Sequence, residues 1–150
     1  MPWPQHELPN LTQANCQITS EAKRAYNCVA WAAGDTRRWW WPIRLPGVNY
    51  WPKSAPRELT IEAFVAAYET LGYSSCGHGR PEANVEKIAL YARFNGRALT
   101  PTHVARQLES GVWTSKLGPC EDVSHITVDD VGGPLYGEVV CYMSRPRGTQ

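Results

Sequence analysis

The spacing of apolar residues changes at Gly72, and this change constrains the fold more than any other feature of the 150-residue chain. Before Gly72, the clearest pattern covers residues 61–71, where apolar residues recur at helical spacing behind Thr60, a residue type that caps helices. After Gly72, apolar and polar residues alternate, which is typical of strands. The strands expected from this alternation cover residues 87–92, 103–108, 112–117 and 136–143.

The order of these two patterns predicts an α+β fold in which N-terminal helices pack on a C-terminal antiparallel sheet. Asn95-Gly96 and Ser110-Gly111 are turn signals, so we expect a meander of about four strands. Three prolines within residues 1–19 predict an irregular N-terminal arm, and four more within residues 35–59 predict a long ordered loop. A chain of this length is expected to form a single domain over residues 1–150.

Composition excludes several classes of partner. Fifteen basic and 14 acidic residues leave a formal charge of +1, so no charge excess draws the chain toward nucleic acid or an anionic membrane. No apolar stretch is long enough to cross a bilayer, and no basic segment followed by an apolar run forms a secretory signal. We therefore expect a cytoplasmic monomer without a nucleic-acid or membrane partner. Export out of the cell would have to use a route that reads no signal of this kind.

The five cysteines are an odd number and contain no CxxC pair, which argues against a disulfide framework and favours free thiols. A catalytic cysteine attacks as the thiolate, so it needs a helix N-terminus or a neighbouring imidazole to lower its pKa. Cys28 stands where a short helix over residues 28–33 is expected to begin before Gly34 ends it. Cys28 is therefore the candidate nucleophile, and the alternative is a buried, inert cysteine.

His103 is the candidate base for this thiol, because it opens a predicted strand of the sheet. If Leu108 pairs with Val112 across the Ser110-Gly111 turn, His103 and Ser115 lie on one face and diagonally opposite each other. Ser115 or a nearby polar side chain then orients the imidazole. The other candidates are Gln107 and Asp122 as orienting residues, His125 as a second base, and Asn27 as an oxyanion donor.

Two short motifs carry a resemblance to a known group of enzymes. The run NCVAWA at residues 27–32, followed by HVA at residues 103–105, resembles the compact papain-like cysteine hydrolases of the NlpC and CHAP amidase type. This resemblance implies a papain-like fold, with Cys28 as nucleophile, His103 as general base and Ser115 at the position of the third residue. Those families usually carry His, Asn, Asp or Gln at that position, so Ser115 departs from their pattern.

Nearly the whole chain also resembles an uncharacterised bacterial domain family, which implies no particular activity. The NlpC and CHAP resemblance predicts a peptidase, amidase or deamidase that acts on an amide bond of a peptide-type substrate, and we expect no metal or cofactor. A toxin or effector role is compatible with a small hydrolase of this kind. The family motifs are YNCxAWAxGD at 26–35, WWWP at 39–42, YWP at 50–52, KIALYA at 87–92, THxARQL at 102–108, GxWTSKLG at 111–118, DxxH at 122–125 and YG at 136–137.

A zinc-stabilised domain is the first alternative hypothesis. Cysteine and imidazole are the ligands that zinc prefers, but no pair in this chain has the usual spacing of a zinc motif. The possible ligands are Cys76, His78, His103, Cys120 and His125.

A non-enzymatic binding domain is the second alternative. The chain has seven tryptophans, and Trp39, Trp40 and Trp41 are consecutive, so they can form an aromatic cleft that binds a ligand without chemistry. In an enzyme, the same loop would flank the substrate cleft. The residues expected to line that cleft are Trp31, Trp39, Trp40, Trp113 and Lys116.

Overall fold

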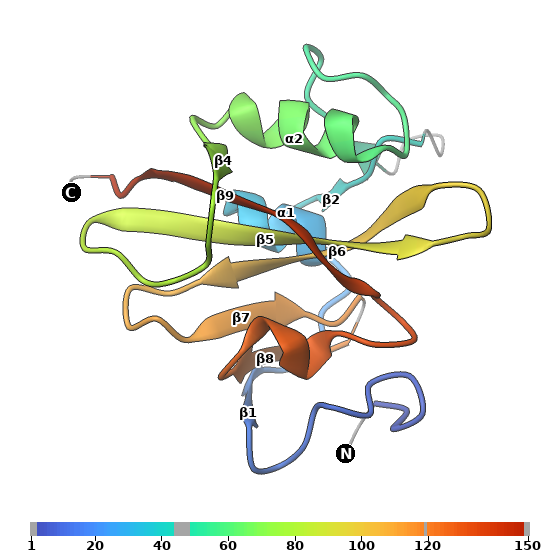
Figure 1. The fold of residues 1–150 in the computed structure, drawn as a ribbon, viewed down its shortest axis with the longest axis vertical. Coiled ribbons are helices and arrows are strands. Elements are labelled where there is room, and N and C mark those ends of the chain that lie inside the picture. The colour runs from blue at the N-terminus through green and yellow to red at the C-terminus, as the bar shows by residue number, and fades with distance from the viewer. Residues whose placement is uncertain (1–2, 44–48, 119, 149–150) are drawn as a thin grey trace.

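The computed structural model describes residues 3–43, 49–118 and 120–148. Its main element is a seven-stranded antiparallel sheet in the order β1-β8-β7-β6-β5-β9-β4 (Figure 1). A second, two-stranded parallel sheet pairs β2 (Trp39–Trp40) with β3 (Asn49–Tyr50). The strands of the main sheet are β1 (Cys16–Ser20), β4 (Ser74–Cys76), β5 (Val85–Phe94), β6 (Leu99–Gln107), β7 (Trp113–Lys116), β8 (Asp122–His125) and β9 (Glu138–Pro146).

Two α-helices and one 3-10 helix, η1 (Val128–Val131), complete the described elements. Helix α1 (Cys28–Ala33) begins after Asn27 and ends at Gly34, which adopts the left-handed conformation with φ of 83°. Helix α2 (Ile61–Glu69) begins after Thr60, whose side chain accepts a hydrogen bond from the Ala63 backbone N–H. The predicted starts of both helices are therefore confirmed. None of the described helices is long and apolar enough to span a membrane.

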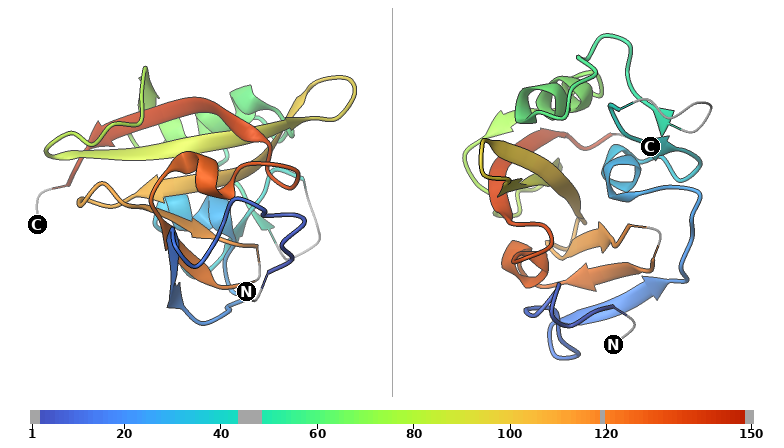
Figure 2. Two further views of the ribbon diagram at one scale, coloured as in Figure 1. Left: turned by 60° about the horizontal axis from the view of Figure 1, so that its bottom comes forward. Right: turned by 90° about the vertical axis from the view of Figure 1, so that its right-hand side faces the viewer.

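The sheet separates two hydrophobic clusters, one on each face. Helices α1 and α2 pack on the face that carries Ile88, Leu90 and Val104. The N-terminal arm and η1 cover the opposite face, which carries Ala89 and Tyr91. Because β5 is buried on both faces, its sequence is a continuous apolar run instead of an alternating one. Figure 2 shows α1 inside the bend of the curved sheet, between the part with β5, β6 and β9 and the part with β7, β8 and β1.

The predicted α+β, papain-like architecture, with N-terminal helices on a C-terminal sheet, is wrong. The sheet dominates the described chain, the helices have only six and nine residues, and a strand precedes both of them. The arm expected over residues 1–19 ends earlier, because residues 16–20 form β1 at the edge of the sheet. Strands β1, β4 and β8 have three to five residues, too few to show a clear alternation in the sequence. The expected meander is also incorrect, because β9 pairs with β5 and β4.

Candidate functional site

Cys28 is the first residue of α1, and tertiary contacts hold that end of the helix in place. The Asn27 side chain accepts hydrogen bonds from the Ala30 and Trp40 backbone N–H groups and donates one to the Trp40 carbonyl. The helix N-terminus is thus tied to β2 as well as capped. Cys28 itself is 6% exposed and lines a cavity of about 300 Å³.

Strands β6 and β7 part near this thiol. Among the described residues, their ladder contains only the pairs Arg106–Thr114 and Gln107–Trp113. The β6 residues that precede Arg106 therefore have no partner on β7. The Val104 backbone N–H is near the Cys28 thiol and favours its ionised form. Val104 directly follows His103, but side chains of a strand alternate, so the His103 ring is turned away from Val104 and lies against Tyr91 and Tyr136. No hydrogen bond between described residues joins Cys28 Sγ to the His103 ring.

His103, Ser115 and His125 form a continuous buried hydrogen-bond chain across three strands. His103 Nε2 lies 2.9 Å from Ser115 Oγ, and Ser115 Oγ lies 2.8 Å from His125 Nε2. His125 Nδ1 lies 2.8 Å from the Thr127 carbonyl oxygen. The predicted register is confirmed, because Leu108 N–H bonds to the Val112 carbonyl and places His103 and Ser115 diagonally on one face. The sequence left the third residue open, and the structure places both Ser115 and His125 beside the base.

The Thr127 carbonyl sets the direction of every hydrogen bond in this chain. A carbonyl oxygen only accepts, so His125 carries its proton on Nδ1 and presents a lone pair on Nε2. Ser115 therefore donates its hydroxyl proton to His125 and accepts from His103 Nε2–H. His103 is left with an unprotonated Nδ1, which is buried and has no hydrogen-bond partner among the described residues. That lone pair is the one available to act as a base.

Burial keeps the thiol and the imidazole neutral at rest. It raises the pKa of Cys28 to about 11, although N–H groups of Val104, Val29 and Cys28 itself and the Lys116 charge oppose the rise. Burial, and secondarily the neighbouring His125, lowers the pKa of His103 to about 3. The sequence-based expectation of a depressed thiol pKa is therefore wrong, because desolvation outweighs the nearby backbone N–H groups.

Tyr136 links the base to the cavity. Its ring stacks on His103, with centroids 4.1 Å apart and planes 15° apart, and the same side chain lines the cavity beside Cys28. Tyr91 contacts His103 edge-on at 5.2 Å between centroids. Two aromatic rings therefore immobilise the imidazole. The residues lining the cavity are Asn27, Cys28, Trp39, Trp41, Asn49, Thr102, Gly118 and Tyr136.

The other proposed orienting residues are occupied elsewhere. The Gln107 side chain donates a hydrogen bond to the Gly79 carbonyl, and Asp122 accepts a hydrogen bond from the Tyr26 hydroxyl. Asn27 lines the cavity, but its carboxamide is engaged by the helix cap and by Trp40.

Of the five predicted cleft residues, only Trp39 lines the cavity. Trp40 points the other way, into the core, because successive side chains of a strand alternate. Trp113 packs in the cluster on the opposite face of the sheet, and Trp31 donates to the Thr114 hydroxyl. Lys116 is fully buried, and its ammonium donates to the backbone carbonyls of residues 23, 118 and 120. Lys116 therefore cannot meet a substrate directly.

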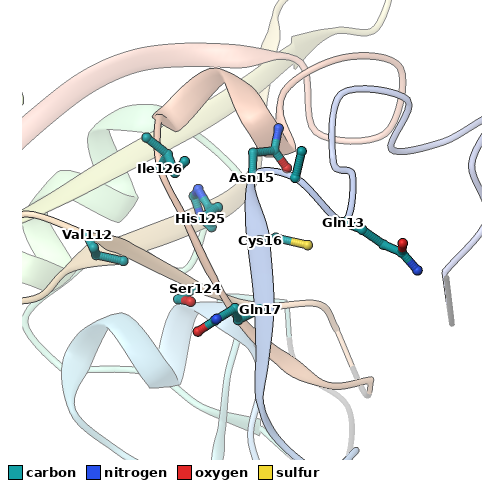
Figure 3. A pocket seen from close by; sticks show the side chains of 9 residues that line it. Gln13, Asn15, Cys16, Gln17, Val112, Ser124, His125 and Ile126 are labelled. Carbon is teal, nitrogen blue, oxygen red and sulfur yellow. The ribbon is translucent and has the colours of Figure 1, made fainter.

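A second cavity of about 270 Å³ lies at the far end of the hydrogen-bond chain, between β1 and β8. Figure 3 shows its walls, with His125 on β8 and Cys16 on β1, which pair across the sheet. Both ring nitrogens of His125 are already bonded to Ser115 and Thr127. The His125 ring is therefore part of the interior hydrogen-bond chain, and neither of its nitrogens is free to bind a ligand in this cavity.

The described residues offer no cluster of three or more His, Cys, Asp or Glu side chains suited to a metal ion. The hypothetical zinc ligands are dispersed. Cys76 bonds to the His78 carbonyl, His78 lies beside Lys87, and His103 and His125 are bridged by Ser115. Within the part of the chain that is described, the geometry gives the zinc hypothesis no support.

Sequence reasoning missed Tyr136, Asn49 and Thr102. Tyr136 belongs to the YG motif, and Gly137 is the signal that could have identified it. Gly137 has φ of 76°, and a Cβ at this position would collide with the Ala92 carbonyl of β5. This close approach brings Tyr136 onto His103. No local signal marks Asn49 or Thr102, whose positions depend on pairing with distant strands.

Comparison with known proteins gives a family without an assigned activity. A family described as "Domain of unknown function (DUF7689)" matches residues 17–144, which include the whole candidate site. Neither a curated protein nor a solved structure matches the chain.

Proposed function

The chain belongs to the DUF7689 family, and we propose that it is a cysteine hydrolase that cleaves an amide bond with Cys28 as nucleophile and His103 as base. The observation that carries this proposal is the buried hydrogen-bond chain that leaves His103 Nδ1 unpaired and unprotonated. Most buried polar side-chain atoms have a hydrogen-bond partner, so an unpaired imidazole nitrogen calls for an explanation. Support also comes from the Cys28 thiol, which lines a cavity together with Tyr136, the residue whose ring stacks on His103.

The reaction begins from neutral partners. His103 Nδ1 takes the thiol proton as Cys28 sulfur bonds to the substrate carbonyl carbon, and the Cys28 backbone N–H stabilises the oxyanion. The carbon–nitrogen bond then breaks, and the proton passes from His103 to the leaving amine. Water hydrolyses the thioester, which releases the carboxylic acid and restores the thiol. A substrate that fills the cavity excludes water. Because Tyr91 and Tyr136 hold the His103 ring in place, this step requires the Cys28 side of the site to move toward the ring when substrate binds.

His125 gives the transient positive charge a second location. When His103 gains a proton on Nδ1, it can pass its Nε2 proton to Ser115 as Ser115 passes its own to His125. Burial lowers the pKa of His125, but its bond to Thr127 and the Asp130 carboxylate oppose the decrease. These opposing effects are absent at His103, so His125 accommodates the charge better.

Trapping an acyl-enzyme with a generic activated ester tests the nucleophile directly. The protein is mixed with p-nitrophenyl esters, and intact mass spectrometry is used to look for one acyl group on Cys28 with release of p-nitrophenolate. We expect Cys28→Ala to abolish this adduct, and His103→Gln to slow acylation by at least about 100-fold, the usual contribution of a general base.

Cys16→Ala is the matched control, because Cys16 is also a free thiol beside a cavity but lies on β1 next to His125. It should acylate like the unmodified protein. Acylation only at Cys16, Cys76, Cys120 or Cys141, or none at any cysteine, refutes the proposed nucleophile. All five cysteines are free, and we propose the reducing cytoplasm as the compartment in which such a thiol works.

A further inference from the structure

The cavity beside Cys28 has walls that are aromatic and held rigidly. Trp41 packs edge-on against Phe64, with centroids 5.7 Å apart, and Tyr136 is stacked on His103. The Trp39 indole N–H is bonded to the Arg24 carbonyl. These rings are already ordered, so little conformational entropy is lost when a ligand binds. Contact with them therefore contributes more fully to the free energy of binding.

Three of the polar side chains that line the cavity, those of Asn27, Asn49 and Thr102, are already bonded within the protein. Asn49 donates to the Ile43 carbonyl, Thr102 donates to the Tyr136 carbonyl, and the Asn27 carboxamide is engaged by α1 and Trp40. None of the described lining residues carries a charge. A charged ligand group would lose its hydration there without gaining an oppositely charged partner among the described lining residues.

The size of the cavity indicates a bulky group. Its volume of about 300 Å³ corresponds to about ten water molecules at the ~30 Å³ that each occupies in the liquid. Water against such apolar walls is readily displaced by an apolar side chain. Because the Cys28 thiol is part of the wall, the group nearest the attacked carbonyl is the one that fills this space.

We propose that the substrate is an amide whose acyl part carries a bulky, uncharged apolar side chain, aromatic or branched aliphatic, which binds between Trp39, Trp41 and Tyr136. This inference rests on the proposed function, because it assigns the specificity of the same thiol. Side-chain burial of this kind favours an apolar group over a small one by about 10- to 100-fold.

Four chloromethyl ketones test this selectivity on the whole protein. N-acetyl-phenylalanyl, -glycyl, -glutamyl and -lysyl chloromethyl ketones share one reactive carbon and differ only in the neighbouring side chain. Cys28 sulfur bonds to the methylene carbon, chloride leaves, and the thiol proton passes through His103 to solvent. The rate of adduct formation at Cys28 is followed by intact mass and by peptide mapping.

We expect the phenylalanyl probe to label Cys28 at least about 10-fold faster than the other three. Equal rates at Cys28 would refute the apolar specificity and leave the nucleophile in place. Fastest labelling by the lysyl probe would refute it also, and would indicate cation binding by the aromatic rings. If no probe labels Cys28 while other cysteines react, both this inference and the proposed function fail.

Introducing a charge into the wall gives a second, independent measurement. Asn49→Lys should reverse the preference, so that the glutamyl probe becomes faster than the phenylalanyl probe. Gln13→Lys is the matched control, since Gln13 lines the second cavity, and it should keep the original order. An unchanged preference in a folded Asn49→Lys protein would show that this cavity does not select the substrate.

Discussion

The Tyr136 ring lies flat on the His103 imidazole, and Gly137 is the residue that permits this stack. Gly137→Ala adds a Cβ that collides with the Ala92 carbonyl, in addition to the strain of a positive φ. Gly34→Ala is the control, because Gly34 has a similar φ of 83° and open space around it. We expect about 1–2 kcal/mol of destabilisation for Gly34→Ala and about 1–3 kcal/mol more for Gly137→Ala, measured by urea unfolding. Equal losses would show that the close approach is unimportant.

Ser115→Ala should damage both stability and acylation. The substitution leaves His103 Nε2 and His125 Nε2 without partners in the interior, at about 1–3 kcal/mol for each buried group. It also frees His103 to take the other tautomer, which removes the lone pair from Nδ1. Acylation should slow by about 10- to 100-fold, the usual effect of losing an orienting partner.

Nitrogen NMR of the imidazoles provides the readout that distinguishes this orienting role from a general loss of stability. The single His103 tautomer of the native protein should become a mixture in Ser115→Ala. Ser124→Ala, a serine on the neighbouring strand that lines the second cavity, should retain both the tautomer and the acylation rate. A retained tautomer in Ser115→Ala would contradict the assigned direction of the chain.

Stability should fall in mild acid because of His103. Its pKa is lowered from 6.5 to about 3, so below pH 6.5 the unfolded chain binds a proton that the folded protein excludes. This loss begins as pH falls through 6.5 and continues to about 3, at up to about 1.4 kcal/mol per pH unit, and burial of His125 adds to it. His103→Gln should flatten the dependence measured by urea unfolding between about pH 7 and pH 5. The exposed His6→Gln should not, and an identical slope in all three proteins would contradict the assignment.

Small alkylating reagents should label Cys28 slowly in the native protein. A thiol with a pKa of about 11 has a thiolate fraction about 100-fold smaller at neutral pH than one at the ordinary value of 9.0, and Cys28 is also 6% exposed. We expect iodoacetamide to modify the half-buried Cys76 and Cys120 before Cys28, and urea to raise the rate of labelling at Cys28. Mass-spectrometric mapping of a time course decides this order. Rapid labelling of Cys28 by iodoacetamide would mean that the resting thiol is ionised.

Local rules were sufficient where the structure depends on neighbouring residues. Thr60 marks the start of α2 and Gly34 the end of α1, as predicted, because a capping residue satisfies backbone groups within one turn of the helix. The relation between His103 and Ser115 also followed from sequence, since one short turn sets the register and side chains of a strand alternate.

Contacts between distant segments decided the rest. The papain-like architecture, the arm and the meander were incorrectly predicted, because β1, β4 and β8 are stable only when paired with strands far away in sequence. His125 was proposed as a second base, and the pairing of β8 with β7 places it beside Ser115. The close approach of Gly137 to β5 places Tyr136 beside His103. The pairing of the Cys28 thiol with the His103 imidazole is a prediction from the sequence alone. Tertiary structure determined their ionisation, because burial in the folded core raises one pKa and lowers the other.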